Sequence, residues 1–270
     1  MKPFLKWPGG KYRQVSRICK QLGHGKRLVE PFVGSAAVFL NTDFNSYLLA
    51  DSNADLINLY IRLQNEGGRF IKYCQRFFTV KNNCRDAYYD FRTMFNETDE
   101  VRKKSALFLY LNRHCYNGLC RYNSRGEFNV PFGRYHLPYF PAREMRFFYT
   151  KATRAKFIQS RFTETMRQVK QEDVVYCDPP YAPLSSTACF TNYSSVGFNW
   201  EQQLELADWA GKLSGSGIKV VISNHDIDSI TQLYRDCGAN MDQFKVRRTI
   251  SCQADNRIKV GELLAVFQPA

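Results

Sequence analysis

One tetrapeptide combines residue types that could do chemistry together, Asp178-Pro179-Pro180-Tyr181. It directly follows the apolar run Val174-Val175-Tyr176-Cys177, which predicts a buried strand and places the loop at the carboxyl edge of a sheet. An exocyclic amine such as adenine N6 is a poor nucleophile, because its lone pair is delocalised into the ring. A carboxylate and a rigidly held proline carbonyl can each accept a hydrogen bond from one of its two N–H groups, which localises that lone pair on the nitrogen. The loop is therefore suited to methylation of an aromatic amine.

The candidate catalytic residues are Asp178 and the carbonyl of Pro179 as hydrogen-bond acceptors, and Tyr181 as an aromatic face on which an extruded base can stack. No covalent enzyme intermediate is needed, since positioning and fixed electrostatics suffice. The same loop could hold the amine of cytosine N4. A cytosine-C5 enzyme usually carries its thiolate in a Pro-Cys pair, and the sequence has none. A rigid loop with a capping Asp and a core Tyr is the non-catalytic alternative.

A second group of residues suggests a bound nucleoside. Glu30-Pro31-Phe32-Val33-Gly34-Ser35 ends a short predicted strand, and its glycine would let the backbone approach a cofactor closely. Asp51 ends the next predicted strand, where a carboxylate can accept hydrogen bonds from ribose hydroxyls. A dehydrogenase could use the same acid, but the glycine pattern G-x-G-x-x-G is absent, which counts against one.

The amino-terminal segment Phe4 to Tyr12 is a glycine loop with one lysine after the glycines. It lacks the G-x-x-x-x-G-K-[ST] spacing of a phosphate-binding P-loop. The nine cysteines follow no paired Cys/His spacing, so neither a zinc site nor a disulfide framework is predicted. The sequence therefore predicts no metal cofactor.

The charge is concentrated in one stretch. The chain has a formal net charge of +13, and residues 101–156 hold 12 Lys and Arg against only Glu127 and Glu144. A basic block of this kind favours a polyanionic partner, although charge alone does not separate DNA from RNA.

Composition and length indicate a folded protein outside the membrane. Hydrophobic residues form 44% of the 270 residues, enough for a core. No apolar run approaches the ~20 residues needed to cross a bilayer, and the first residues do not resemble a secretory signal. We expect a cytoplasmic protein, associated with the nucleoid through DNA, with no membrane and no obligate protein partner.

Alternating apolar runs predict an α/β fold made from both ends of the chain. Strands are expected at 28–31, 47–50, 157–158, 174–177, 219–222, 244–250 and 262–267, with helices at 12–22 and 200–213, the latter capped by Asn199. Residues 55–113 are expected to be helical in several pieces, most clearly at 101–112. Asn123-Ser124-Arg125-Gly126 predicts the turn of a β-hairpin. Residues 182–198 are expected to form a lid after the catalytic loop.

The motifs in order resemble bacterial Dam-type DNA adenine-N6 methyltransferases, and the resemblance covers nearly the whole chain. The segments that carry it are Phe4-Leu5-Lys6-Trp7-x-Gly9-Gly10-Lys11, Val29 to Gly34, Ala50-Asp51-x-Asn53, Tyr110 to Arg113, Tyr116 to Arg121, Gly126 to Tyr135 and Asp178 to Tyr181.

The resemblance implies a Rossmann-like class I methyltransferase sheet, 1–55 and 145–270, interrupted by a mainly helical DNA-recognition insertion, 56–144, that contains the hairpin. It implies S-adenosylmethionine as methyl donor and double-stranded DNA as partner, with GATC as target and the adenine flipped out of the duplex. The implied cofactor-binding residues are Trp7, Lys11, Phe32, Gly34, Asp51 and Asp178, and the implied DNA-binding residues are Lys6, Tyr116, Asn117, Leu119, Arg121 and Arg134.

One position departs from the family pattern. Ala36 stands where a second glycine is usual, and its methyl group could crowd the cofactor. A DNA-binding relative with weakened catalysis is therefore a further alternative, as is a methyltransferase acting on RNA or protein. The sequence leaves open the biological role, whether in mismatch repair, DNA replication, gene regulation or defence.

Overall fold

The computed structural model describes residues 1–181, 198–247 and 259–269. The chain divides into two compact units. The first comprises Met1–Val15, Val33–Asp43 and Asp51–Gln159, and the second Ser16–Phe32, Phe44–Ala50 and Ser160–Ala270. The expected lid at 182–198 lies almost wholly outside the described residues.

The sheet has the strand order β3-β2-β1-β4-β5-β7-β6. Strands β1, β2, β4 and β5 pair in parallel, whereas β7 runs antiparallel to both β5 and β6. The expected α/β sheet is confirmed, with a mixed rather than wholly parallel edge. The strands are β1 (Arg27–Glu30), β2 (Ser46–Asp51), β3 (Ala155–Gln159), β4 (Asp173–Cys177), β5 (Lys219–His225), β6 (Asn240–Arg247) and β7 (Lys259–Phe267).

Strand β4 lies at the centre of the sheet, and all of its residues are buried. Its register against β1 is held at the first residue of each strand, where Arg27 Nε and Nη2 both donate to the Asp173 carboxylate, at 3.0 and 2.5 Å. A bidentate pair of this kind fixes geometry as well as charge. The loop that leaves β4 at Cys177 therefore starts from a fixed point.

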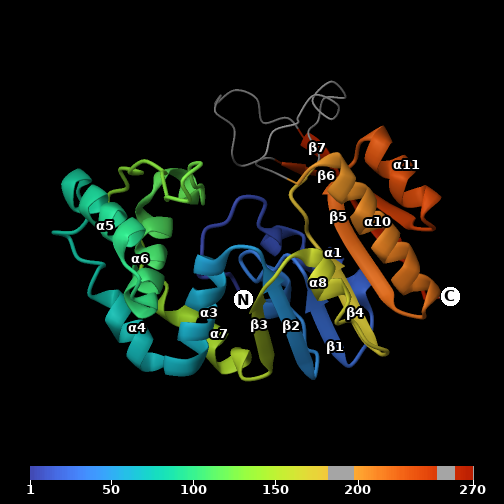
Figure 1. The fold of residues 1–270 in the computed structure, drawn as a ribbon, viewed down its shortest axis with the longest axis horizontal. Coiled ribbons are helices and arrows are strands. Elements are labelled where there is room, and N and C mark those ends of the chain that lie inside the picture. Colours follow the sequence, from blue (N-terminus) through green and yellow to red (C-terminus); the bar gives the residue numbers. More distant parts are fainter. Residues whose placement is uncertain (182–197, 248–258, 270) are drawn as a thin grey trace. The chain divides into compact units, whose positions relative to one another are not determined.

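The helices of the second unit pack on this sheet. Helix α10 (Trp200–Gly215) lies against β5 and β7, and α11 (Asp228–Asp236) against β6 (Figure 1). The predicted cap of α10 is confirmed, since the Asn199 side chain accepts from Gln202 N at 2.9 Å. Among the described residues of this unit, the remaining helices are α1 (Val15–Leu22), of which Val15 belongs to the first unit, and α8 (Phe162–Met166).

The helical pieces expected at 55–113 are confirmed in the first unit. They are α3 (Ala54–Glu66), α4 (Gly68–Gln75), α5 (Arg85–Glu97) and α6 (Val101–His114), and the unit also contains α2 (Ala37–Asn41), α7 (Ala142–Ala152) and the short 3-10 helices at Lys11–Arg13 and Tyr116–Gly118. Helices α3, α4 and α5 all pack against α6. Nearly every residue of α6 from Ser105 onward is buried, which explains why its sequence shows a continuous apolar run rather than a stripe.

The predicted hairpin around Asn123 to Gly126 forms a turn closed by antiparallel bridges, Tyr122 with Phe128 and Cys115 with Phe132. Around the turn, Asn123 N donates to Glu127 O at 2.9 Å. Its arms are single bridges rather than continuous strands, because side chains take up much of the backbone hydrogen bonding: Asn123 Oδ1, for example, accepts from Arg125 N and Glu127 N.

The α6 helix ends in a buried histidine whose state depends on pH. His114 is 1% exposed and stacks on Tyr110 at 3.9 Å between ring centroids, with its Nδ1 at 2.8 Å from the Tyr110 carbonyl. Burial, opposed by the hydrogen bond to Tyr110 and reinforced by the charges of Lys6 and Arg113, lowers the pKa of His114 to about 4. The ring is therefore neutral in the folded protein at neutral pH.

We expect His114 to make folding weaker in mild acid. Between its unfolded pKa of 6.5 and its folded pKa of about 4, the unfolded chain binds the extra proton, so stability present above pH 6.5 is lost as the pH falls. The free energy of unfolding should drop by about 2 kcal/mol between pH 7 and pH 5 on account of this residue. In urea unfolding, the free energy of unfolding of the His114→Phe variant should depend less on pH than that of the wild type. The His24→Gln variant, changed at an exposed histidine, should keep the pH dependence of the wild type. An equal pH dependence in all three proteins would contradict this prediction.

Candidate active site

The candidate catalytic loop, Asp178 to Tyr181 in the second unit, is anchored by a buried polar network. Directly after β4, Asp178 is half-buried and Pro179 is buried. The Pro180 carbonyl accepts from Gln203 Nε2 of α10 at 3.2 Å. Gln203 Oε1 in turn accepts from Asn224 Nδ2 at 3.1 Å and from the Tyr234 hydroxyl at 3.3 Å. The loop is thus tied to α10, β5 and α11 through one side chain.

Gln203 was not singled out from the sequence, although a signal was present. The buried residues of α10 are Gln203, Leu206, Ala207, Ala210 and Leu213, so the glutamine occupies the first position of an apolar stripe. A polar residue at such a position needs a buried partner, because an unpaired amide would cost about 1–3 kcal/mol. The partner here is the carbonyl of the catalytic loop.

The end of the catalytic loop contains an aromatic ring with a strongly perturbed hydroxyl. Tyr181 packs edge-on against His225, with 4.7 Å between ring centroids. Burial, followed by the neighbouring Asp178 carboxylate, raises the pKa of Tyr181 well above its ordinary value. The ring is therefore a neutral aromatic surface beside the Asp178 carboxylate.

Phe32, at the end of β1, lies in the same unit within a cluster of three aromatic rings. Its centroid is 5.6 Å from that of Phe162, in a stacked arrangement, and 5.5 Å from that of Phe198, edge to face. Phe162 and Phe198 are also 5.5 Å apart. Of the implied cofactor-binding residues, Phe32 and Asp178 belong to this unit.

The other implied cofactor-binding residues lie in the first unit, where Asp51 connects several of them. Its Oδ2 accepts from Gly34 N and its Oδ1 from Asn53 N, both at 3.0 Å. Burial raises the pKa of Asp51, while the backbone hydrogen bonds of Asn53, Gly34 and Ser52 act in the opposite direction. The Gly34 carbonyl accepts from the Tyr60 hydroxyl at 2.6 Å. Tyr60, which sequence reasoning did not single out, fixes the glycine from its other side.

Trp7 packs directly on this glycine. Gly34 has φ +44°, and a Cβ placed on it would lie 2.9 Å from Trp7 Nε1 and 3.2 Å from Cδ1. Trp7, Gly34 and Asp51 are thus brought together. Lys11 is buried, and its Nζ donates to Gly9 O at 2.7 Å, closing the glycine loop on itself.

Ala36, where the family usually has glycine, adopts the left-handed conformation at φ 62°, ψ 29° as the N-cap of α2. This conformation costs a residue with a Cβ about 1–2 kcal/mol. The structure therefore gives a backbone reason for the usual glycine, separate from crowding of a cofactor.

The implied DNA-binding residues also lie in the first unit. Tyr116, Asn117, Arg121 and Arg134 are exposed, while Lys6 and Leu119 are half-buried. Asn117 and Arg134 have positive φ of 54° and 53°, and Asn117 N donates to the Tyr135 hydroxyl at 2.9 Å. Lys6 Nζ lies 3.8 Å above the Tyr135 ring, and burial together with the charge of Arg113 lowers the pKa of Lys6.

The buried side chain of Asn112 joins the amino-terminal segment to the end of α6. It accepts from Lys6 N at 2.9 Å and donates to Lys6 O at 2.7 Å, so it pairs with the backbone of Lys6 as a neighbouring strand would. Lys6 also fills the space beside Gly118, where an added Cβ would lie 2.2 Å from Lys6 Cβ. One implied DNA-binding residue is therefore packed against the segment that carries the others.

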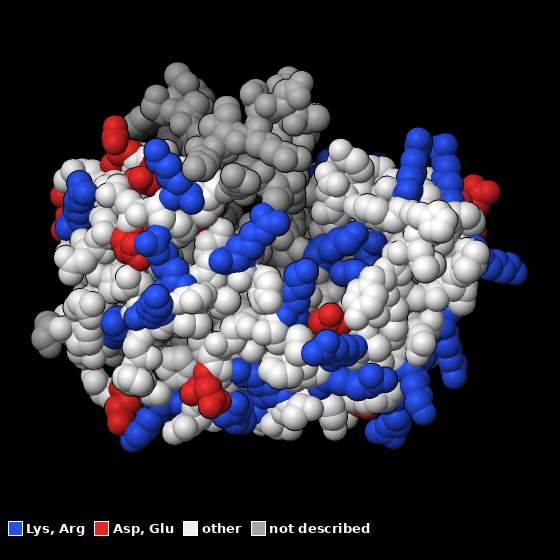
Figure 2. Space-filling view, turned by 180° about the vertical axis from the view of Figure 1, so that it is seen from behind, with Lys and Arg blue, Asp and Glu red and all other residues white. Residues whose placement is uncertain are grey.

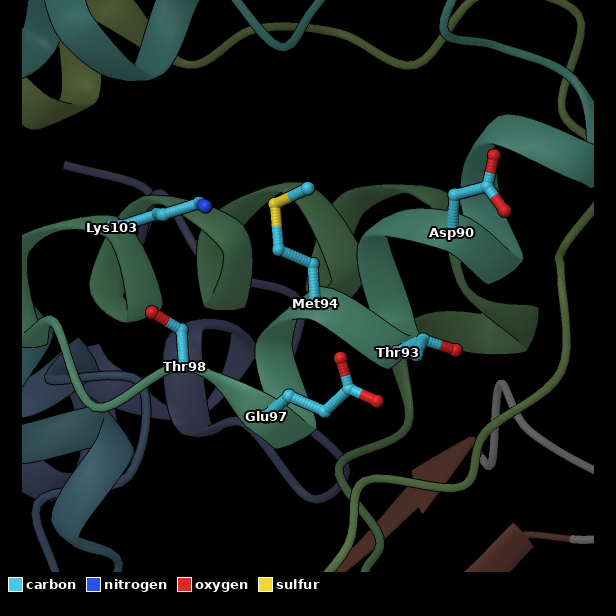
Figure 3. Close-up of a pocket in the computed structure, with 6 residues that line it drawn as sticks. All are labelled: Asp90, Thr93, Met94, Glu97, Thr98 and Lys103. Atoms are coloured by element: carbon cyan, nitrogen blue, oxygen red, sulfur yellow. The ribbon is translucent and has the colours of Figure 1, made fainter.

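A cavity of about 390 Å³ opens beside α5, lined by Asp90, Thr93, Met94, Glu97, Thr98 and Lys103 (Figure 3). None of the implied site residues lines it, and its two carboxylates would repel a phosphate. Within the described ranges there is no cluster of His, Cys, Asp and Glu that could hold a metal, and no helix long and apolar enough to cross a membrane.

Comparison with known proteins decides the family. Residues 7–250 match the model of the D12 class of N6 adenine-specific DNA methyltransferases. The chain belongs to this family. It is 51% identical over 267 residues to a DNA adenine methylase of Vibrio cholerae serotype O1, covering 98% of this chain and 96% of that one. It is 48% identical to the DNA adenine methylases of Escherichia coli K12 and Serratia marcescens over 266 residues, 98% of this chain and 95% and 98% of theirs.

Membership confirms the Dam-type resemblance and an enzyme that methylates adenine in DNA. With the sheet order, it also confirms the Rossmann-like methyltransferase fold. The alternatives acting on RNA or protein are set aside by the family assignment.

The packing of Trp7 on Gly34 predicts a specific cost for Gly34→Ala. The variant should lower the free energy of unfolding by about 1–3 kcal/mol more than Gly126→Ala, since the indole must shift to admit the new methyl group. Gly126 is the matched control, with φ +77° but no atom within 4 Å of its added Cβ. Urea unfolding followed by tryptophan fluorescence measures both, and equal losses would show that Trp7 does not pack there.

Proposed function

We propose that this enzyme transfers a methyl group from S-adenosylmethionine to N6 of an adenine flipped out of duplex DNA, within the sequence GATC. The observation that carries the proposal is the Asp178-to-Tyr181 loop, which leaves the buried strand β4 and is anchored through Pro180 to Gln203. Such an anchor holds acceptors in place before the substrate arrives, which is where most of the catalysis would come from.

The residues of the loop have separate roles. Asp178 accepts a hydrogen bond from one N6 hydrogen, and the Pro179 carbonyl accepts one from the other. These two bonds draw the nitrogen toward tetrahedral geometry and make it more nucleophilic. The Asp178 carboxylate also faces the proton that N6 loses on methylation. Tyr181, neutral over the working pH range because burial raises its pKa, offers the base a face on which to stack. S-adenosylmethionine, when bound, supplies the electrophilic methyl group.

The residues of the first unit fit the nucleoside part of this cofactor. Both Asp51 oxygens accept backbone N–H groups, and since a carboxylate has about four lone-pair sites, a ribose hydroxyl can still donate to it. Gly34 presents bare backbone beside the Trp7 indole. We assign Trp7, Lys11, Gly34 and Asp51, with Phe32 and Asp178 of the second unit, to cofactor binding.

DNA binding is assigned to Lys6, Tyr116, Asn117, Leu119, Arg121 and Arg134, with 56–144 as the recognition domain and 1–55 and 145–270 as the catalytic domain. Support comes from the basic stretch 101–156 and from the excess of Lys and Arg over acids on the face drawn in Figure 2. Within the aromatic segment from Tyr116 to Tyr122, the exposed Tyr116 is suited to filling the space that the flipped adenine leaves, whereas Tyr122 is held inside the hairpin by Asp55 and Phe128. Localisation with the nucleoid would follow from DNA binding.

The Asp178→Ala variant should lose methyl transfer while keeping its fold, because alanine cannot accept a hydrogen bond from N6. Loss of a group that acts mainly in the transition state should lower kcat by a factor on the order of 10² to 10³. Labelled methyl transfer to duplex DNA measures this, with thermal unfolding as the test of folding. A folded variant that kept more than a tenth of wild-type kcat would refute the role of Asp178.

The Arg121→Ala variant should relax sequence preference. Arginine makes two hydrogen bonds to guanine O6 and N7, worth about 1–3 kcal/mol of discrimination. We expect the variant to methylate GATC more slowly than the wild type does. On the duplex altered at the base pair that Arg121 reads, the rates of the two proteins should be nearly the same. Arg125→Ala, at the exposed turn of the same hairpin, is the matched control and should slow every duplex alike, if at all. A uniform loss across the panel for Arg121→Ala would make it a phosphate contact instead.

A further inference from the structure

The two residues that flank Arg121 are both bonded to the segment that carries Asp51. On one side, Asn53 Nδ2 donates to Cys120 Sγ at 3.5 Å. On the other, the Tyr122 hydroxyl donates to Asp55 Oδ2 at 2.7 Å, a charge-assisted hydrogen bond. Asn53 N donates to the Asp51 carboxylate, and the Asn53 side chain caps α3 through Leu56 N at 3.1 Å. Two short links therefore join the hairpin to residues 51–55.

Arg121 itself is held within the hairpin. Its Nε donates to Asn129 Oδ1 at 2.8 Å and its Nη2 to Asn129 O at 3.3 Å, while its carbonyl accepts from Asn129 N at 3.1 Å. These two bonds use the Nε hydrogen and one Nη2 hydrogen, so the outer Nη1 and Nη2 N–H groups stay available for guanine O6 and N7. Arg121 can therefore read a base while it stays bonded to Asn129. Because Asn129 ties the guanidinium to the hairpin, a displacement of Arg121 by DNA also displaces the backbone on either side, at Cys120 and Tyr122.

The Tyr122 hydroxyl is suited to transmitting such a change. Burial, followed by the neighbouring Cys120 and Asp55, raises the pKa of Tyr122 far above its ordinary value, so the group stays a donor. Tyr122 also packs edge to face on the buried Phe128 at 5.9 Å, which fixes the ring. Because the ring is fixed in the hairpin and its hydroxyl donates to Asp55, a displacement of the hairpin also displaces Asp55.

We propose that the Tyr122–Asp55 hydrogen bond, with the Asn53–Cys120 contact beside it, couples DNA recognition by the hairpin to cofactor binding at Asp51. The inference rests on the proposed function, in which Arg121 faces DNA and Asp51 binds the cofactor. Coupling of this kind is reciprocal: the correct DNA sequence strengthens cofactor binding by the same factor by which the cofactor strengthens binding of that sequence. In coupled sites, one ligand typically changes the affinity for the other by a factor of about 5 to 150.

The test compares cofactor affinity with and without DNA. Calorimetry measures the Kd of S-adenosylhomocysteine, which cannot react, for the full chain alone and saturated with a GATC duplex. For the wild type, the Kd without DNA divided by the Kd with DNA should exceed one. Tyr122→Phe removes only the hydroxyl and should bring the ratio close to one while leaving the Kd without DNA nearly unchanged. Asp55→Asn, a near-isosteric loss of the charged acceptor, should do the same.

Tyr110→Phe is the matched control, since it removes a buried hydroxyl of the same unit that donates to Asn82 O at 2.6 Å. It should keep the wild-type ratio even where it lowers stability. A wild-type ratio of one, or an unchanged ratio in both Tyr122→Phe and Asp55→Asn, overturns the coupling. Methylation of GATC duplex by the wild type, measured in parallel, separates the two proposals: if that activity is present and the ratio is unchanged, only the coupling fails, and if it is absent, both fail.

Discussion

The carboxylate of Asp51 is the interaction on which the rest of the first unit's candidate site depends. Its two oxygens hold Gly34 and Asn53 by their backbone N–H groups. Gly34 is thereby fixed where Trp7 can pack on it, with Tyr60 bonded to its carbonyl. Asn53 is fixed where its side chain can cap α3 and reach Cys120. One half-buried acid thus organises the proposed nucleoside site and its connection to the hairpin.

In the second unit, the loop from Asp178 to Tyr181 is held in place by prolines and by one buried glutamine. In the proposed mechanism, this candidate catalytic loop has to hold hydrogen-bond acceptors in place, and two successive prolines remove most of the backbone freedom. The remaining freedom is limited by Gln203, which binds the Pro180 carbonyl and is itself bound by Asn224 and Tyr234. Preorganised acceptors of this kind suit a reaction that needs no covalent intermediate.

Much of this was predictable from sequence, and the failures have identifiable causes. The strands, the cap of α10 and the helices of residues 55–113 follow from periodicity and capping residues. The antiparallel direction of β7 does not, because apolar runs carry no direction. The hairpin arms are single bridges because asparagine side chains compete for backbone groups. Gln203, Asn112 and Tyr60 were missed because their partners are backbone groups distant in sequence.

The central claim is that this chain methylates adenine N6 in GATC, and one measurement tests it most directly. Purified protein is incubated with labelled S-adenosylmethionine and a set of duplexes, one containing a single GATC and the others altered at one base pair each, and the DNA is digested to nucleosides. The account predicts label in N6-methyldeoxyadenosine, with the GATC duplex preferred. Label in N4-methyldeoxycytidine, or equal incorporation into every duplex, would contradict it.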